Sequence, residues 1–414
     1  MPHTTTVVIG AGQAGLATSR CLSGLGVDHV VIERGDVAQR WRIQSWDSLH
    51  LLTPNWMTRL PGFQYDGSDP NGFMSIPELI ALFERYAAAS LAPIEAGTTV
   101  ESVERAHAGF RVATDRGVWS AKSVVVATGY CDRPAVPPAS RRLASSITQI
   151  VPADYRRPGQ LPAGGVLVVG ASSTGVQLAD EIQQTGRQVT LAVGRHTRLP
   201  RHYRGDDIMR WLDRLGVLSQ PAEAVHAIEI SRQQPSLQLV GRSDHSSLDL
   251  GTLHAMGVRL VGRVRDITGH AISLAADELL ATMAAADIKM TEILMRIDRF
   301  ITTNGLPATA PEPFRPTWPL AADSPDFLDL EAEGINTVIW ATGYRRAYPW
   351  LRVPVLDARG EIVHEGAITP AFGLYVLGMN FQRRRNSSFI DGVGGDAWTI
   401  AEKIARSSVR GRVA

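Results

Sequence analysis

The sequence predicts an α/β protein in which one nucleotide-binding unit is inserted into another. Two observations predict this class. A glycine-rich loop joins a buried strand to a helix at residues 6–25 and again at residues 165–185, and each unit is followed by a strand that ends in Ala-Thr-Gly. Strand–loop–helix units of this kind are typical of Rossmann domains, which bind dinucleotides. We therefore expect two nested Rossmann-type dinucleotide-binding domains, of which the first is discontinuous and the second is inserted.

Composition excludes several other classes of protein. The chain has 414 residues, of which 44% are hydrophobic and 20% charged, so it can build more than one proper core. A net charge of +1 gives no overall field that would attract nucleic acid or an anionic membrane. Two cysteines, Cys21 and Cys131, are too few for a disulfide framework or a cysteine-rich metal site. The N-terminus runs directly into a strand, and no apolar run reaches the roughly 20 residues of a membrane span. We expect a cytoplasmic protein with no metal, nucleic-acid or membrane partner.

The first glycine loop has every part of a dinucleotide site in register. Gly10 allows the tight turn after the strand, Gly12 lets the backbone approach a pyrophosphate, and Gly15 lets helix and strand pack closely. The start of the helix offers unpaired N–H groups and a partial positive charge to phosphates. Glu33 follows the second strand, where its carboxylate can accept hydrogen bonds from ribose hydroxyls and repel a 2′-phosphate. The ligand expected here is FAD or NAD.

The second glycine loop differs at two positions. Ser172 replaces the middle glycine between Gly170 and Gly175, and its small side chain need not block a phosphate. Arg195 follows the second strand in place of an acid, and a guanidinium there can bind a 2′-phosphate through two hydrogen bonds. We expect three further arginines to extend this positive patch: Arg198, Arg201 and Arg204. The alternative is that these arginines form a solvated basic face. The ligand expected here is NADPH.

We expect the chain to cross between two domains twice. The strands at 122–130 and 335–344 both end in Ala-Thr-Gly, and residues 373–380 predict a returning strand that closes the first domain. Proline-rich segments mark the crossings near residues 160 and 318. We predict an FAD-binding domain at 1–160 plus 318–414, and an NADPH-binding domain with a helical insertion at 161–317. That insertion includes a helix over 278–301 with these residues near one face: Leu280, Met283, Ala284, Ile288, Thr291, Leu294, Met295 and Ile297.

Over essentially its whole length the chain resembles the class B flavin-dependent monooxygenases. This superfamily contains flavin-containing monooxygenases, plant auxin-forming enzymes and Baeyer–Villiger monooxygenases, and the chain is most similar to compact bacterial members labelled flavoproteins of cation transport. The resemblance rests on both glycine loops, Glu33, both Ala-Thr-Gly strands and the segment VDHVVIERGDVAQRW, which ends at Trp41. It implies that NADPH reduces FAD and that the reduced flavin and O2 form a C4a-(hydro)peroxyflavin. This species would oxygenate a small organic substrate, at nitrogen or sulfur in preference to a carbonyl.

Four other functions fit the same architecture. An NADPH oxidase or reductase would use both cofactors without oxygenating a substrate, and Baeyer–Villiger oxygenation would act on a ketone. A disulfide reductase needs a redox cysteine pair near the flavin, whereas Cys21 and Cys131 are far apart in sequence. A non-enzymatic nucleotide-sensing subunit of a transporter has no hydrophobic segment or interaction tail to support it.

The resemblance also assigns cofactor contacts by position. Those to FAD lie in the first loop, after its second strand and at strand ends: Gly10, Gly12, Gln13, Ala14, Gly15, Glu33, Arg34, Gln39, Arg40, Trp41, Thr53, Val100, Thr128, Gly129, Gly378 and Met379. Those to NADPH lie in the second loop and beyond: Gly170, Ser172, Ser173, Thr174, Gly175, Arg195, Thr197, Arg198, Thr342 and Gly343. Arg383, Arg384 and Arg385 are either an anion contact or a solvated basic turn.

One position departs from the superfamily pattern, and one catalytic position has to be assigned among neighbouring residues. If Tyr155 ends the fingerprint F-x-G-x-x-x-H-x-x-x-Y, its histidine falls on Val151, so the coupling of domain motion to catalysis is in doubt. This loss argues against a standard Baeyer–Villiger enzyme. Flavin-containing monooxygenases place an asparagine near the reactive flavin carbon, and we assign this catalytic position to Asn55. A turn-forming Pro-Asn pair at 54–55 is the alternative.

Overall fold

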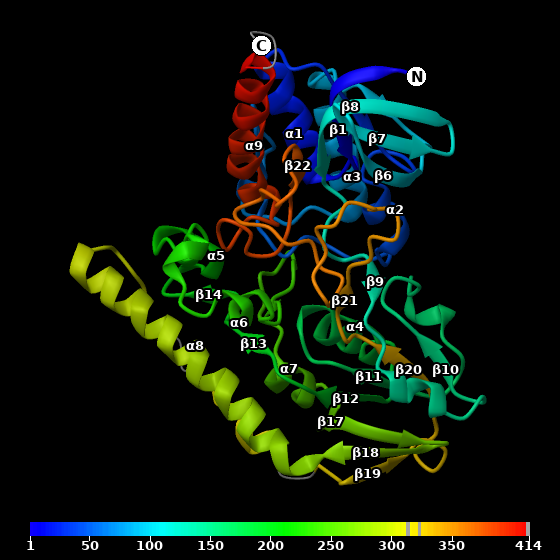
Figure 1. Ribbon diagram of the computed structural model, residues 1–414. Helices are drawn as coiled ribbons and strands as arrows, with labels where there is room; N and C mark the ends of the chain where they lie inside the picture. Colours follow the sequence, from blue (N-terminus) through cyan, green and yellow to red (C-terminus); the bar gives the residue numbers. More distant parts are fainter. Residues whose placement is uncertain (312–314, 322–323, 411–414) are drawn as a thin grey trace.

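A computed structural model describes residues 1–311, 315–321 and 324–410. Two seven-stranded sheets form two lobes, which lie at opposite ends of the molecule in Figure 1. We call the lobe built on β1 (His3–Ile9) the first lobe and the lobe built on β11 (Gly165–Val169) the second lobe. The mixed α/β class predicted from the sequence is confirmed.

The first sheet has the order β5-β2-β1-β8-β7-β6, with β22 paired to β8. Its remaining strands are β2 (His29–Ile32), β5 (Ile94–Glu95), β6 (Val100–Ala106), β7 (Gly109–Thr114), β8 (Gly117–Val126) and β22 (Leu374–Val376). The amino half of β8 pairs with β7, and its carboxyl half pairs in parallel with β22. The predicted return of the chain to this lobe after residue 373 is therefore confirmed.

The second sheet has the order β10-β20-β11-β12-β17-β18-β19. Its remaining strands are β10 (Thr148–Ile150), β12 (Val189–Val193), β17 (Arg259–Thr268), β18 (Ala271–Ala275), β19 (Phe327–Asp329) and β20 (Ile335–Trp340). β20 pairs in parallel with β11 on one side and with β10 on the other, and β19 pairs with β18. β10, β19 and β20 therefore belong to this sheet, although all three lie outside the range 161–317 expected for this lobe. Residues 312–314 of the expected second crossing lie outside the described residues.

Both central strands bury alternate side chains on opposite faces, as a sheet covered on both sides requires. In β1, Val7 and Ile9 belong to one core cluster and Val8 to another, and all three are at most 6% exposed. In β11, Leu167 and Val169 face one cluster while Val166 and Val168 face another. Layers of this kind fix the carboxyl ends of the strands, where the two glycine loops begin.

Helices cover the sheets, and short elements connect them. The helices are α1 (Gln13–Gly24), α2 (Gln39–Gln44), α3 (Ile76–Ala89), α4 (Ser173–Gln183), α5 (Ile208–Arg214), α6 (Ile228–Arg232), α7 (Leu250–Ala255), α8 (Ala276–Asn304) and α9 (Ile390–Arg410). The short strands are β3 (Arg59–Leu60), β4 (Phe63–Gln64), β9 (Arg133–Pro134), β13 (Thr197–Arg198), β14 (His202–Tyr203), β15 (Asp206–Asp207), β16 (Leu237–Gln238) and β21 (Tyr344–Arg345). In Figure 1, α1 and α9 lie side by side in the first lobe, and α8 runs along the outside of the second.

The predicted long helix is confirmed, but its predicted face is partly wrong. The buried residues of α8 are Leu279, Met283, Ala286, Asp287, Met290, Leu294, Ile297 and Ile301. Leu280, Ile288 and Met295 are instead 46%, 59% and 54% exposed. The buried set follows steps of three and four residues, the spacing of one helix face. The predicted set combined apolar residues from two neighbouring faces, because the helix also carries apolar residues on its solvent side.

A segment between α2 and α3 reaches from the first lobe into the second. Trp46 is 7% exposed and belongs to the same core cluster as Val166, Val168 and Tyr155. Leu49 packs against that cluster as well. The two lobes therefore share apolar packing in addition to their chain crossings.

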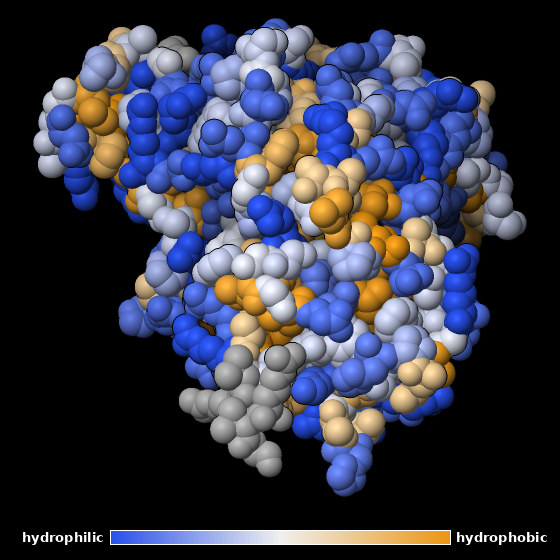
Figure 2. Space-filling model, turned by 90° about the horizontal axis from the view of Figure 1, so that it is seen from above, coloured by the Kyte–Doolittle hydropathy of each residue, from blue (hydrophilic) through white to orange (hydrophobic). Residues whose placement is uncertain are grey.

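The surface is mixed in polarity. Figure 2 shows the end of the molecule that is uppermost in Figure 1, and hydrophilic residues predominate there, with apolar residues in smaller groups near the centre. Within the described residues, no helix combines the length and the apolar character needed to cross a membrane.

Candidate dinucleotide-binding sites

The two glycine loops have the same backbone geometry. Gly10 and Gly170, the first glycine of each loop, have φ of +106° and +110°, a region that favours glycine. A Cβ on Gly10 would lie 2.7 Å from the carbonyl oxygen of Ala127, and a Cβ on Gly170 would overlap the carbonyl oxygen of Ala341. Ala127 and Ala341 begin the two Ala-Thr-Gly sequences. Each of these strand ends therefore packs directly against a glycine loop.

The last glycine of each loop is required by helix packing. A Cβ on Gly15 would overlap the carbonyl oxygen of Gly10, and a Cβ on Gly175 would overlap that of Gly170. These positions bring α1 and α4 close to the strands that precede them, as the sequence predicts for Gly15.

The backbone conformation at the middle position of the loop explains why the second loop can have a serine there. Gly12 has φ −85° and ψ −171°, and Ser172 has nearly the same values, −76° and −176°. This extended backbone suits any residue. A Cβ on Gly12 would meet nothing within 4 Å, so the space beside the loop is open. Neither α1 nor α4 has a side-chain cap at its N-terminus, which leaves N–H groups of the first turn available to phosphate oxygens.

The ribose ends of the two loops carry opposite charges. Glu33 is 9% exposed, and its carboxylate accepts hydrogen bonds from the N–H groups of Ala11 (2.8 Å) and Gly35 (3.1 Å). A carboxylate has further acceptor capacity, so a ribose could still bind there. Arg195 lies two residues beyond β12 and is exposed. Among the described residues it has no hydrogen-bond or ion-pair partner, and its guanidinium can reach an incoming anion.

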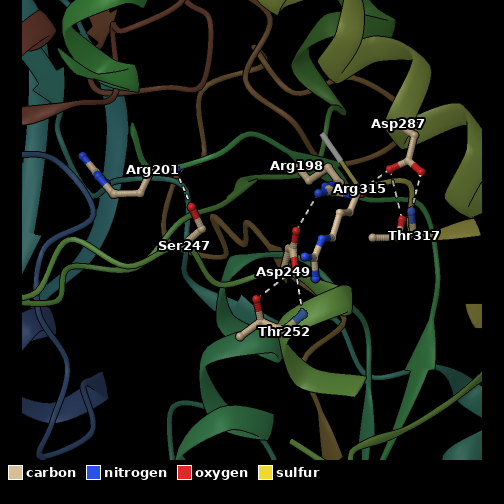
Figure 3. Close-up of polar contacts among 8 residues, drawn as sticks. All are labelled: Arg198, Arg201, Ser247, Asp249, Thr252, Asp287, Arg315 and Thr317. Carbon is tan, nitrogen blue, oxygen red and sulfur yellow. Dashed lines mark hydrogen bonds and ion pairs between the residues drawn. The ribbon is translucent and has the colours of Figure 1, made fainter. Parts of the chain in front are cut away.

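The expectation that three further arginines extend the positive patch is wrong. Arg198 donates to Asp287 (2.8 Å) and Asp249 (2.6 Å), a network drawn in Figure 3. Arg201 is fully buried and donates two hydrogen bonds to Asp207. These acids neutralise the arginines and could not be placed beside them from sequence spacing.

Arg204 is also paired, at 3.2 Å from Asp298. The acids that neutralise Arg198 are themselves held in place, Asp249 by Thr252 and Asp287 by Thr317 (Figure 3). The predicted contact of Arg198 with NADPH stays a prediction, with two carboxylates already at its guanidinium.

Sequence reasoning missed two glutamines that hold the second loop. The Gln238 side chain is fully buried and donates to the carbonyl oxygen of Ala171 at 2.6 Å, inside the loop. Gln177 donates to the Leu239 carbonyl (3.0 Å) and to the Ser173 hydroxyl (2.9 Å). Gln238 lies on β16, which pairs with β13 and thereby also positions Thr197. Their role depends on a contact across about 65 residues of chain, for which the sequence carries no local signal.

Several predicted FAD contacts converge at the carboxyl ends of the first sheet. The Gln13 amide donates to the Ser388 carbonyl at 3.3 Å, and a Cβ on Gly378 would lie 3.0 Å from the Ala14 side chain. Arg40 donates to the Thr128 carbonyl at 3.3 Å and to Asp132 at 3.2 Å. The start of α1, the start of α2, the end of β8 and the turn after β22 therefore meet at one place, where α/β proteins bind ligands.

The other predicted contacts differ in their exposure. Met379 is 4% exposed and its sulfur lies 3.9 Å from the Tyr348 hydroxyl. Arg34 is exposed, Val100 begins β6, and Trp41 packs against the first core. For the remaining predicted FAD contacts, Gly129 follows Thr128, Gln39 accepts from the Asp36 N–H, and Thr53 is half-buried. Their contact with FAD stays a prediction. At the second lobe, Thr342 donates to the Ala135 carbonyl at 3.0 Å, and the Gly343 carbonyl accepts from the Ala135 N–H.

The side chain of Asn55 is occupied by a neighbouring loop. It is 5% exposed; its amide nitrogen donates to the Asp69 carbonyl (2.9 Å) and its oxygen accepts from the Met74 N–H (2.8 Å). Its backbone N–H donates to the Gly72 carbonyl. These contacts give Asn55 a structural role in holding residues 69–74, and its catalytic assignment stays a prediction.

Neither cysteine is arranged for dithiol chemistry. Cys21 and Cys131 are both free. Burial raises the pKa of the Cys131 thiol to about 11 and that of Cys21 to about 12. Since the thiolate is the reactive form, both thiols are largely unreactive at neutral pH.

One group of possible metal ligands occurs among the described residues. A ring nitrogen of His202, one of His245 and a carboxylate oxygen of Asp207 all lie within 4.8 Å of one another. The Asp207 carboxylate already accepts from Arg201 and from the Met209 N–H that begins α5. A cation would sit beside the buried Arg201 guanidinium, so these residues are better suited to their present pairing.

A buried carboxyl lies behind the arginine turn at 383–385. Asp396 on α9 is 1% exposed, and Arg383 lies 3.7 Å from it. Burial raises the pKa of Asp396, while a hydrogen bond from Ser387 and the charges of Arg383 and Arg384 oppose this shift. Arg385 donates to Gln220 and Gln234, whereas Arg384 is exposed. Two of the three arginines thus have partners within the protein.

Two substitutions in the first loop should separate cofactor binding from folding. Gly12→Ala places its methyl group in open space, so we expect unchanged melting of the apoprotein and an FAD dissociation constant raised about tenfold or more, because the pyrophosphate must approach there. Gly15→Ala should lower the free energy of unfolding by about 1–3 kcal/mol through overlap with the Gly10 carbonyl. Thermal melting and flavin fluorescence titration measure the two effects. Wild-type FAD affinity in Gly12→Ala would contradict a close approach of the pyrophosphate to Gly12.

Asp396→Asn should change the pH dependence of stability. Because the folded pKa is raised above its ordinary value of 3.8, the folded protein keeps a proton that the unfolded chain releases, and the carboxyl's contribution to stability falls as pH rises through this window. The amide does not titrate. The melting temperature of the variant minus that of the wild type should therefore increase with pH from the ordinary pKa up to the raised one, and then level off. A difference that is constant or decreases with pH contradicts this reading.

Comparisons with known proteins agree with this geometry. The profile of the pyridine nucleotide-disulphide oxidoreductase family matches residues 7–214. A CzcO-like oxidoreductase of Geobacillus kaustophilus is 32% identical over 404 residues, which cover 96% of this chain and 97% of that protein. An indole-3-pyruvate monooxygenase of Oryza sativa subsp. japonica is 30% identical and covers 96% of this chain and 90% of its own length. A flavin-containing monooxygenase from Stenotrophomonas maltophilia has the same fold, with a TM-score of 0.69, 18% identity and coverage of 99% of this chain and 100% of its own. The chain belongs to the pyridine nucleotide-disulphide oxidoreductase family, as an oxidoreductase related to CzcO-like proteins and class B flavin monooxygenases.

Proposed function

We propose that this protein is an NADPH-dependent FAD monooxygenase that oxygenates a small organic substrate at nitrogen or sulfur. One observation carries the proposal: two glycine loops share one backbone geometry but end at opposite charges, Glu33 and Arg195. An acid at the ribose suits FAD, and a reachable guanidinium suits the 2′-phosphate of NADPH. We assign FAD to the first loop and NADPH to the second. The division of the chain at residues 160 and 318 is part of this proposal, except that pairing places β10, β19 and β20 in the second lobe.

The residues of the chain would bind and orient the two cofactors. The first turn of α1 and Glu33 would hold the pyrophosphate and ribose of FAD, while Arg40 fixes the end of β8 beside α2. Gln238 would keep the second loop in shape through Ala171. When bound, FAD reduced by NADPH supplies the activation of O2, and the protein supplies alignment and protection from water.

An NADPH oxidase that releases hydrogen peroxide is the second candidate. It is favoured by Val151, an apolar residue that packs at the edge of a core cluster where the superfamily fingerprint has a histidine. The free cysteines and their raised thiol pKa disfavour a disulfide reductase.

Isotope labelling distinguishes these functions. The FAD-loaded protein should consume NADPH under oxygen-18 gas and place one labelled oxygen atom in the product when sulfides, amines and ketones are supplied in turn. Labelling of a sulfide or an amine supports the proposal, and labelling of a ketone product alone identifies a Baeyer–Villiger enzyme. Hydrogen peroxide formed in equal amount to the NADPH consumed, with no labelled product, identifies an oxidase. A protein that cannot be loaded with FAD excludes all three.

Replacing Arg195 should change the choice of nicotinamide cofactor. Arg195→Ala removes the guanidinium proposed to bind the 2′-phosphate, so we expect KM for NADPH to rise about tenfold while KM for NADH stays unchanged. Arg259→Ala is a matched control. Arg259 is also partly exposed, but it lies at the amino end of β17, whereas Arg195 follows the carboxyl end of the neighbouring parallel strand β12. Equal losses with NADPH and NADH would contradict a role in recognising the 2′-phosphate. Steady-state kinetics with both cofactors measure this.

A further inference from the structure

The linker between the lobes places one guanidinium among four backbone carbonyls. The terminal nitrogen Nη1 of Arg156 lies 3.2 Å from the Ser45 carbonyl oxygen, 2.9 Å from that of Ala153 and 3.0 Å from that of Tyr155. Its other terminal nitrogen donates to the Ile43 carbonyl. Two of these carbonyls belong to the linker and two belong to the end of α2. A cation at the C-terminus of a helix also interacts favourably with the helix dipole.

The linker side of this contact is fixed in the second lobe. Tyr155, directly before Arg156, is fully buried in the core cluster that contains Val168. On the α2 side, Trp46, directly after Ser45, is buried in the same cluster. The Asp47 N–H donates to the Arg156 carbonyl at 2.9 Å, and the Arg156 N–H donates to Gln160 at 2.7 Å. The Arg156 backbone therefore cannot move independently of the second lobe.

The other side of the contact leads to the proposed flavin site. α2 carries three of the predicted FAD contacts, Gln39, Arg40 and Trp41. Immediately before α2, the Ala38 N–H donates to the Ala11 carbonyl at 3.1 Å, within the first glycine loop. Arg40 then joins α2 to the end of β8 through the Thr128 carbonyl. A shift at the C-terminus of this six-residue helix would therefore reach both the glycine loop and the neighbouring strand end.

We propose that Arg156 is a positioning residue that sets α2, and with it the flavin, relative to the NADPH-binding lobe. The two terminal nitrogens of the guanidinium carry four N–H groups, and Nη1 shares its two among three carbonyls, whereas a single ammonium has only three donors on one atom. Val151, at the fingerprint histidine position, has no polar side chain to make such a contact. This inference rests on the proposed function, because it takes FAD as the ligand of the first loop and NADPH as the ligand of the second.

Arg156→Ala, Arg156→Lys and Arg157→Ala test the inference. Arg157 is the matched control, since it is the next residue in the same linker, its side chain is 72% exposed, and it makes only a 3.6 Å ion pair with Asp47. Visible circular dichroism of bound FAD and the FAD dissociation constant report on the flavin without turnover. Anaerobic stopped-flow reduction gives the limiting rate of flavin reduction and the NADPH dissociation constant separately. Melting temperatures identify any variant that is generally destabilised.

We expect Arg156→Ala to alter the visible circular dichroism of the flavin and to slow limiting flavin reduction about tenfold or more, because small misplacements of reacting groups cost large factors in rate. The NADPH dissociation constant should change less than the rate. Millimolar guanidinium should partly restore the rate and spectrum of Arg156→Ala, Arg156→Lys should recover only part of the effect, and Arg157→Ala should behave as wild type.

Three results would overturn the inference. The first is a wild-type flavin spectrum and reduction rate in Arg156→Ala. The second is an equal effect of Arg156→Ala and Arg157→Ala. The third is a lower melting temperature in both Arg156 variants with an unchanged rate of reduction per bound flavin. Failure of the proposed function looks different: the wild-type protein itself would bind no FAD, or its flavin would not be reduced by NADPH.

Discussion

The close contact between each glycine loop and the end of an Ala-Thr-Gly strand is the constraint on which the rest of the structure depends. Gly10 faces the Ala127 carbonyl and Gly170 faces the Ala341 carbonyl, with no room for a Cβ in either place. The contact sets the distance between the first strand of each unit and its neighbour, and Gly15 and Gly175 then set the distance of the following helix. Its presence twice, on separate sheets, makes the two loops equivalent in shape despite the serine in the second.

Equivalent shape leaves electrostatics to distinguish the two sites. Glu33 is held at the edge of its loop by two backbone N–H groups, whereas Arg195 is exposed beyond β12. The arginines that follow Arg195 along the chain contribute little free positive charge, because Asp249, Asp287, Asp207 and Asp298 pair with them. The pairs of Arg198 and Arg201 are buried, and Arg198 joins β13 to Asp249 and to Asp287 on α8.

The sequence allowed good prediction wherever a feature depends on local chemistry. Glycines that must adopt positive φ, the strand at 189–193 and the long helix near 278–301 were all identifiable, and all are present. Predictions were less successful where distant residues decide the outcome. The pairing of β20 with β11 and the contact of Arg198 with Asp287 join segments far apart along the chain. Arg201 and Asn55 find their partners across shorter loops, whose course the sequence does not indicate. The solvent face of α8 shows the same limit, because helical spacing alone cannot tell which of two apolar faces meets the core.

The positions of β20 and β22 have a consequence for how this chain acquires its structure. β20 lies between β10 and β11 although about 165 residues separate it from β11, and β22 completes the first sheet more than 240 residues after β8. During synthesis, neither sheet can be completed until these strands have been made, so the edges of β11 and β8 that they cover stay unpaired until then. We therefore expect neither lobe to become protease-resistant before these strands have been made.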